Sequence, residues 1–427
     1  MNKEKRRVPK LRFPGFTEDW EQRKLGEIFE YLQNNTLSRD SLNYKNPNIK
    51  NIHYGDILVK FDEILDGSNK DIPYINSELD LSKFSKSLLR DGDIVFSDTA
   101  EDDTVGKAIE LQNVKAPFIL GGLHTIPCRP LIPFGKGYLG NFLNSDSYRL
   151  QLRPLIQGIK VSSISKSALK DTMIEYPKNL DEQEKIGSLF YYIAKMITLH
   201  QRKLEHLNLK KKALLQKLFP KNGERYPELR FPGFTDAWEQ SKLGSIGSTY
   251  TGLSGKTKED FGHGEAQYIT YLNVFQNTVS DVAMTDKVEI DTTQNEVKYG
   301  DVLFTTSSET PEEVGMSSVW LGHTPNIYLN SFCFGFRPNQ KIDPYFLGYS
   351  LRAPYMRDKI KILAQGISRY NISKNKVMEL EISLPNNEEQ SLLGSFLRNI
   401  DLGITLHQRK LEHLQLQKKA LLQQMFV

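Results

Sequence analysis

The sequence is poor in cysteine and has no long apolar run. Its 427 residues include only two cysteines, Cys128 and Cys333, so we expect no disulfide framework and a reducing, cytoplasmic compartment. No apolar run approaches the ~18 residues that a membrane-spanning helix needs. Residues 1–10 are basic, but no apolar core follows them, so we expect no secretory signal. The net charge is only +4, so a nucleic-acid site would need locally concentrated positive charge.

Signatures of catalysis and of cofactor binding are missing as well. Gly255-Lys256-Thr257 ends like a phosphate-binding loop, but that motif needs a glycine where Tyr250 stands. Two histidine pairs are six residues apart on expected helices, His200 with His206 and His407 with His413. Metal-binding pairs on one helical face need a spacing near four. His124 and Cys128 have that spacing but lack a second pair. The sequence therefore predicts no catalytic residue, no metal site and no cofactor.

What the chain does contain is an internal duplication. Residues 11–29 and 229–247 are identical at 14 of 19 positions, and residues 197–220 and 404–427 at 19 of 24. The residues between these repeated segments diverge, apart from short motifs that occur in both halves. These motifs, which we call echoes, include Gly-Asp-Ile/Val, Arg-Pro, Gln-Gly-Ile and Ile-Ser-Lys. A duplicated enzyme usually keeps its chemical residues alike in both halves or loses one set. A constant frame around differing interiors instead indicates two binding modules with different targets.

Two long helices are predicted near residues 181–219 and 388–426. Apolar residues recur at steps of three and four through both segments, as in a heptad seam. Polar residues interrupt the seams at equivalent places, which are His200 and Lys211 in the first copy, and His407 and Lys418 in the second. We interpret the helices as an antiparallel coiled-coil pair. The alternative is two unrelated surface helices, each packed on its own domain.

The interiors read as mixed α/β, because short β-branched and aromatic runs alternate with helical segments. We expect two similar globular domains joined by the long helices, with a pseudo-twofold duplication. The predicted segments are residues 1–178 for the first domain, 179–221 for its helix and linker, 222–386 for the second domain, and 387–427 for its helix.

Loops inside the two domains carry side chains that suit DNA. Residues 160–163 and 369–371 fill the same slot, between Gln-Gly-Ile and Ile-Ser-Lys, yet differ in sequence. Hydroxyl, amide, aromatic and basic groups there match base edges and phosphates. The candidate DNA-binding residues are Ser97, Asp98, Thr99, Lys160, Ser162, Ser163, Thr270, Tyr271, Asn273, Thr305, Thr306, Ser307, Ser308, Arg369, Tyr370 and Asn371. Residues 200–221 hold seven basic residues against one acid, which suits either DNA or a solvated helix face.

Taken in order, these motifs resemble the DNA-specificity subunit of type I restriction–modification systems. The match rests on the duplicated Leu-Arg-Phe-Pro-Gly-Phe…Trp-Glu…Lys-Leu-Gly segment, the Gly-Asp-Ile/Val strands, the Ile-Ser-Lys slot, and helices that open on Glu-Gln and close on Lys-Lys-Ala-Leu-Leu-Gln. Residues 31–39 depart from the family, which usually has a Gly-Thr/Ser-Pro stretch there.

The resemblance implies two target-recognition domains on an asymmetric bipartite site of double-stranded DNA, with the helix pair as spacer. It also implies two docked adenine-methylation (M) subunits and two ATP-dependent motor-nuclease (R) subunits, with no catalysis by this chain. An alternative from another class is a non-catalytic coiled-coil adaptor whose two domains bind proteins.

Overall fold

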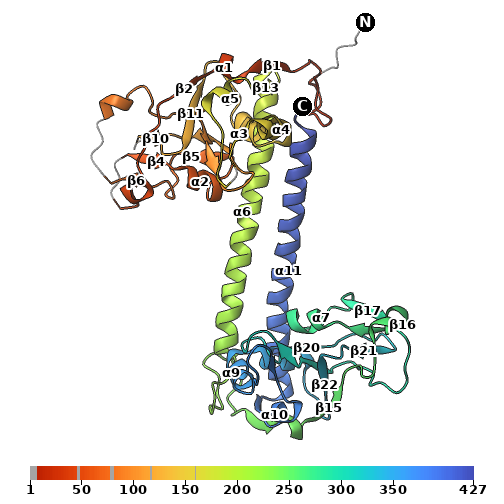
Figure 1. Ribbon diagram of the computed structural model, residues 1–427. Helices are drawn as coiled ribbons and strands as arrows, with labels where there is room; N and C mark the ends of the chain where they lie inside the picture. Colours follow the sequence, from red (N-terminus) through yellow and green to blue (C-terminus); the bar gives the residue numbers. More distant parts are fainter. Residues whose placement is uncertain (1–6, 46–48, 77–80, 116–117, 159) are drawn as a thin grey trace. The chain divides into compact units, whose positions relative to one another are not determined.

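The computed structural model describes residues 7–45, 49–76, 81–115, 118–158 and 160–427. The chain forms two compact units (Figure 1). The first unit holds residues 1–201 and 409–427, and the second holds residues 202–408. Each unit therefore contains one predicted interior and parts of both long helices.

The first unit is built on a five-stranded sheet in the order β2-β11-β7-β9-β5. These strands span Phe29–Tyr31, Thr125–Pro130, Ile94–Ser97, Ala108–Gln112 and Ile64–Asp66. All four residues of the central strand β7 are buried, which explains its apolar Ile-Val-Phe sequence. A second sheet, in the order β10-β4-β6-β3, spans Ile119–Gly121, Lys50–Ile52, Tyr74–Ile75 and Leu42–Asn43. Helix α3 (Tyr138–Leu143) packs on β9.

The second unit has a four-stranded antiparallel sheet in the order β15-β22-β18-β20. Its strands span Gly247–Thr251, Cys333–Pro338, Val302–Thr305 and Ser317–Val319. A three-stranded sheet, β17-β16-β21, spans Thr285–Val288, Phe261–Ile269 and Ile327–Leu329. Helix α8 (Pro344–Arg352) packs on β20 and is followed by α9 (Pro354–Ile362). The mixed α/β interiors predicted from sequence are confirmed.

The duplicated Trp-Glu-Gln-x-Lys-Leu-Gly segment forms the same short ladder in each unit. In the first unit, β1 (Glu21–Lys24) pairs antiparallel with β13 (Met173–Tyr176). In the second, β14 (Glu239–Lys242) pairs antiparallel with β24 (Glu381–Leu384). Both β13 and β24 lie just before a long helix, so the ladder ties the beginning of each domain to its end.

Buried ion pairs account for two of the short sequence echoes. Arg129 donates to both carboxylate oxygens of Asp93 at 2.9 and 2.7 Å, and Arg337 donates to those of Asp301 at 2.8 and 2.6 Å. Both aspartates are 1% exposed. Buried carboxylates persist only when they are paired in this way, so the Gly-Asp and Arg-Pro echoes belong to the scaffold.

The Glu-Gln openings of the long helices are also scaffold. Glu182 and Glu389, each 1% exposed, accept from the guanidiniums of Arg12 and Arg230 at 2.7–2.9 Å. These arginines come from the repeated Leu-Arg-Phe-Pro segment. The following glutamine, Gln183, bridges the backbone at Pro177 and Gly135. Gln390 bridges Pro385 and Asp343 in the same way.

The two long helices are α6 (Leu180–Lys217) and α11 (Asn387–Gln424), each of 38 residues. Each contains a glycine that the packing requires. A Cβ on Gly187 would collide with the carbonyl oxygen of Lys136, and one on Gly394 would collide with Oδ1 of Asp343. The helices are drawn in yellow-green and blue in Figure 1.

Within each unit, the start of one long helix packs with the end of the other. In the first unit the ring of Phe190 stacks on Phe426 at 5.8 Å. In the second, Phe219 lies 6.2 Å from Trp238, in the same core as Leu393. Lys211 also binds Asp401 at 2.6 Å there. The segments of α6 and α11 in the second unit therefore run in opposite directions.

Candidate nucleic-acid interface

The structure brings the candidate residues of the first unit together in a two-stranded ladder. Strand β8 (Thr99–Ala100) pairs antiparallel with β12 (Ser162–Ser163). The hydroxyl of Thr99 donates to the carbonyl of Ser162 at 3.1 Å, and the amide of Ile164 donates to the carbonyl of Asp98 at 2.8 Å. Residues some 60 positions apart thus share one small surface.

The second unit repeats this ladder with different side chains. Strand β19 (Ser307–Ser308) pairs antiparallel with β23 (Tyr370–Asn371). The amide of Ile372 donates to the carbonyl of Thr306 at 2.9 Å. The equivalent positions of the two units are therefore Thr99 and Ser307 on one strand, and Ser163 and Asn371 on the other.

Each ladder supports a loop that we call the tip loop, residues 157–163 without residue 159 in the first unit and residues 365–371 in the second. A bridge closes each loop, between Gln157 and Ser163 and between Gln365 and Asn371. Gly158 and Gly366 have φ values of 113° and 140°, and a Cβ there would meet the carbonyl oxygen of Val161 or of Arg369. Glycine is required at this turn, and Arg369 occupies the place of Val161.

The candidate residues divide by exposure into three groups. Lys160, Ser163, Arg369 and Asn371 are exposed. The half-buried ones are Asp98, Ser162, Thr270, Tyr271, Thr306 and Tyr370. The buried ones are Ser97, Thr99, Asn273, Thr305, Ser307 and Ser308. The buried group supports the surface from beneath, and the other two leave atoms accessible to solvent.

Asn273 shows why a buried candidate has a supporting role. It is fully buried, its amide donates to the carbonyls of Asp281 and Met284 at 2.7 and 2.9 Å, and its oxygen accepts from the amide of Asp281. Thr305 is also fully buried and accepts from the amide of Met316. Both side chains are used inside the domain.

Tyr271 joins a helix start to the ladder of the second unit. Thr270 caps helix α7 (Tyr271–Gln276) by accepting from the amide of Asn273. The Tyr271 hydroxyl donates to the carbonyl of Ser307 at 2.6 Å, and burial raises the pKa of this phenol. The first unit has His53 and Tyr54 at the corresponding start of α2 (Tyr54–Val59). This pair was not predicted from the sequence. The pattern that could have indicated it is a helix N-cap directly after a buried strand.

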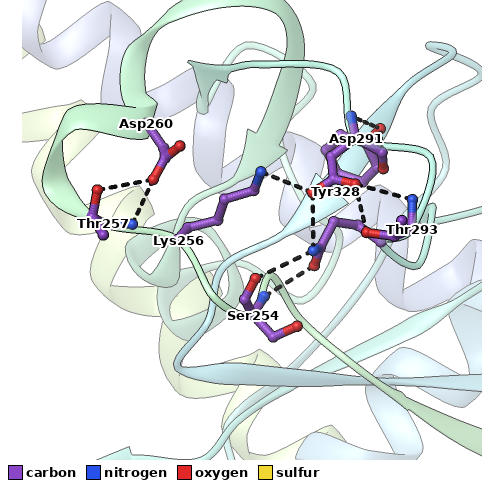
Figure 2. Close-up of polar contacts among 8 residues, drawn as sticks. Ser254, Lys256, Thr257, Asp260, Asp291, Thr293 and Tyr328 are labelled. Carbon is purple, nitrogen blue, oxygen red and sulfur yellow. Dashed lines mark hydrogen bonds and ion pairs between the residues drawn. The ribbon is translucent and has the colours of Figure 1, made fainter.

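The Gly255-Lys256-Thr257 segment has a structural role in the second unit. Figure 2 shows Lys256 directed at Asp291, with its ammonium 2.8 Å from the carboxylate. This contact lowers the pKa of Asp291. Thr257 and Asp260 form a capping box, and the Tyr328 hydroxyl bonds to the backbone of Asp291. The lysine therefore links its loop to Asp291 within the same domain.

Part of the basic stretch at residues 200–221 is neutralised locally. Lys211 pairs with Asp401, and both Lys217 and Lys221 reach Glu228. Arg202, Lys203, Lys210 and Lys212 are exposed on α6. No group of three or more metal-ligating side chains occurs in the described part of the chain. Among those residues, no helix has an apolar stretch long enough to cross a membrane.

Comparison with known proteins places this chain in a family. A family model for the type I restriction modification DNA specificity domain matches residues 17–209 and 235–416, one match for each copy of the duplication. The chain belongs to this family. It is therefore a DNA-specificity subunit, and the specificity subunit is not a catalytic one. The family assignment favours DNA recognition over the protein-adaptor alternative.

Individual relatives agree with the family assignment. The putative type I restriction enzyme MjaX specificity subunit of Methanocaldococcus jannaschii is 25% identical, over 95% of this chain and 92% of its own length. The MjaVIII specificity subunit of the same organism is 23% identical, over 64% and 65%. The crystal structure of the type I S subunit from M. genitalium has a TM-score of 0.58 at 13% identity, covering 98% and 99% of the two chains, which shows a shared fold.

Proposed function

We propose that this specificity subunit reads an asymmetric bipartite DNA site, one half with each unit. The observation that carries the proposal is the pair of ladders, β8/β12 and β19/β23, which share a backbone plan and present different side chains. A shared support keeps the two tip loops in one shape, and the differing residues give each loop its own hydrogen-bonding pattern.

The exposed residues of the tip loops suit base-edge recognition. Arg369 can pair in bidentate fashion with O6 and N7 of guanine, and Asn371 with N6 and N7 of adenine. Lys160 and Ser163 of the first unit suit phosphate and base contacts respectively. The two half-sites are expected to differ because none of these residues is the same at its equivalent position.

The proposed partners are those of the family. Two methylation (M) subunits dock on this chain and modify adenines in the two half-sites, and two restriction (R) subunits join for ATP-dependent cleavage. The long helices set the distance between the half-sites. The complex works in the cytoplasm, and domains 1–178 and 222–386 act as exchangeable modules between helical segments 179–221 and 387–427.

An arginine substitution in the second tip loop tests DNA reading. Arg369→Ala, in the full chain with its methylation subunit, should weaken cognate binding by about 1–3 kcal/mol and relax one base position of one half-site. Lys341→Ala is the matched control, because it removes one exposed positive charge at the opposite end of β22 from the ladder. Competition binding with single-base variants of the site measures both effects.

The salt dependence of the same titrations separates the remaining possibilities. A phosphate contact by Arg369 would weaken cognate and non-specific binding alike and make the salt slope shallower. Unchanged affinity for both classes of DNA would remove Arg369 from the interface. Binding of a protein partner that needs no DNA and does not depend on salt concentration would favour a protein adaptor.

A further inference from the structure

One position in each unit borders the ladder yet lies outside the residues predicted from sequence. It is His124 in the first unit and Phe332 in the second, each directly before the long strand β11 or β22. The backbone holds both in the same way. The amide of Asp98 donates to the carbonyl of His124 at 3.1 Å, and that of Thr306 donates to the carbonyl of Phe332 at 2.9 Å. The two residues therefore occupy one slot of the shared frame.

Both side chains point outward and touch the candidate interface. The imidazole of His124 is 50% exposed, and Phe332 is 55% exposed. The guanidinium carbon of Arg369 lies 5.8 Å from the centre of the Phe332 ring. Both rings are half in solvent beside the ladder, so each is accessible to a contact from outside the chain.

In the first unit, neighbouring groups orient the imidazole. Its Nδ1 lies 3.2 Å from Oδ1 of Asp98, and its ring meets that of Tyr54 edge-on at 5.3 Å. An ionised Asp98 carboxylate can only accept, so when the ring is neutral this contact selects the tautomer in which Nδ1 donates and Nε2 is an acceptor. An acceptor in a DNA groove matches the amino group of adenine or cytosine.

In the second unit, the same slot has the opposite chemistry. The phenyl ring of Phe332 offers only an apolar surface, and the apolar group on the edges of the four bases is the C5-methyl of thymine. Arg369, packed against the ring, is placed to contact the neighbouring base or phosphate. The backbone frame is common, so the side chain alone distinguishes the two units here.

We propose that this slot is a specificity-determining position, at which Phe332 packs against a thymine methyl in one half-site and His124 accepts from an adenine or cytosine amino group in the other. The proposal rests on the proposed function. It adds a residue to each reading surface and the chemical class of its target.

Removing single methyl groups from the DNA tests the contact of Phe332. Each thymine of the recognised duplex is replaced in turn by uracil, which lacks only the methyl, and binding by the full chain with its methylation subunit is measured by competition. We expect one replacement in the second half-site to weaken wild-type binding roughly four-fold, the effect of burying one methyl. The Phe332→Ala variant should bind the two duplexes equally.

Two further variants complete the test. Phe332→His should change the base preference at that same position. His124→Asn should relax one position of the first half-site, because it removes the imidazole. Asparagine is chosen because it tolerates the left-handed backbone (φ of 54°) at residue 124. Ile362→Ala is the control, because Ile362 is 82% exposed at the end of α9, where it lines a cavity with Phe219 and Tyr355. It should leave every preference unchanged.

The outcomes distinguish this inference from the function on which it rests. Wild-type binding that fails to separate the recognised duplex from a scrambled one would overturn both. Three outcomes with specific wild-type binding would overturn the role of Phe332 alone. In the first, no uracil replacement in the second half-site weakens binding, and in the second, the replacement weakens Phe332→Ala as much as the wild type. In the third, the second half-site contains no thymine. Unaltered preferences in His124→Asn would overturn that of His124.

Discussion

The ammonium of Lys418 lies 2.8 Å from both carboxylate oxygens of Glu63 within the first unit. Lys418 belongs to the end of α11, and Glu63 directly precedes β5. In the second unit the equivalent lysine, Lys211 near the end of α6, binds Asp401 at 2.6 Å and lies 5.7 Å from the ring centre of Tyr349. The lysines that interrupt the two apolar seams therefore anchor the last turns of each helix.

The Lys418–Glu63 pair makes the first unit sensitive to acid. Burial opposes ionisation of Glu63, but the ammonium of Lys418, helped by a backbone hydrogen bond and by Lys107, holds the pKa below its ordinary value of 4.5. A lowered carboxyl pKa contributes stability that is present above the ordinary value and is lost as the pH falls through the folded-state value. We expect the free energy of unfolding of the first unit to decline below about pH 4.5.

A lysine substitution checks the origin of this acid sensitivity. Lys418→Met should lower the free energy of unfolding at neutral pH by about 2–4 kcal/mol, because it leaves a largely buried carboxylate unpaired, and should flatten its decline in acid. The exposed neighbour Lys419 provides the control substitution, Lys419→Met. Urea unfolding at several pH values measures both variants, and equal losses would contradict the assignment.

The end of the chain should be essential to a domain that begins 400 residues earlier. Phe426 is 4% exposed, and its ring packs against Trp20, Tyr138, Phe142 and Phe190. Phe426→Ala should cost about 3–5 kcal/mol, the usual loss for a buried phenylalanine. Hydrogen exchange should accelerate in β7 of the first unit and stay unchanged in β18 of the second.

The duplication provides an equivalent substitution in the core of the second unit. Phe219→Ala should accelerate exchange in β18 and leave β7 protected, since Phe219 fills the corresponding core of the second unit. Leu416→Ala serves as the control on α11, because Leu416 is 69% exposed. If either phenylalanine substitution loosened both units equally, the cores would not be independent.

The proposed spacer role of the helices predicts a change in site geometry. Inserting four residues after Glu205 in α6 lengthens the helix by about 6 Å and rotates the rest of the helix by about 400°. On B-DNA that length is nearly two base pairs, and a four-residue insertion is a stutter that coiled coils tolerate. We expect a longer gap between unchanged half-sites or loss of assembly. Methylation at the original spacing would show that the helices do not set it.

The duplication made most of the fold predictable. The two long helices and the mixed α/β interiors could be inferred from repeated motifs and hydrophobic periodicity. The pairing of residues 99–100 with 162–163 was not among these predictions. The Arg129–Asp93 pair was visible only as two short echoes. Nothing in local sequence says that residues 36 positions apart will meet in a buried ion pair.

Other parts were beyond the sequence for physical reasons. Asn273 looked like a base-reading amide, but burial and three backbone hydrogen bonds commit it to the fold. His124 and Phe332 were missed because they share no residue type. Their equivalence lies in the backbone bonds to Asp98 and Thr306, which appear only in three dimensions.

The most direct test of two independent reading units is a chimera. Residues 30–176 are replaced by the corresponding interior of a relative with a known target, and the full chain is expressed with its methylation subunit in cells that lack other adenine methylation. Sequencing then maps the methylated adenines. The account predicts that one half-site changes to that of the relative while the other half-site and the spacing stay the same. A simultaneous change in both half-sites would contradict it.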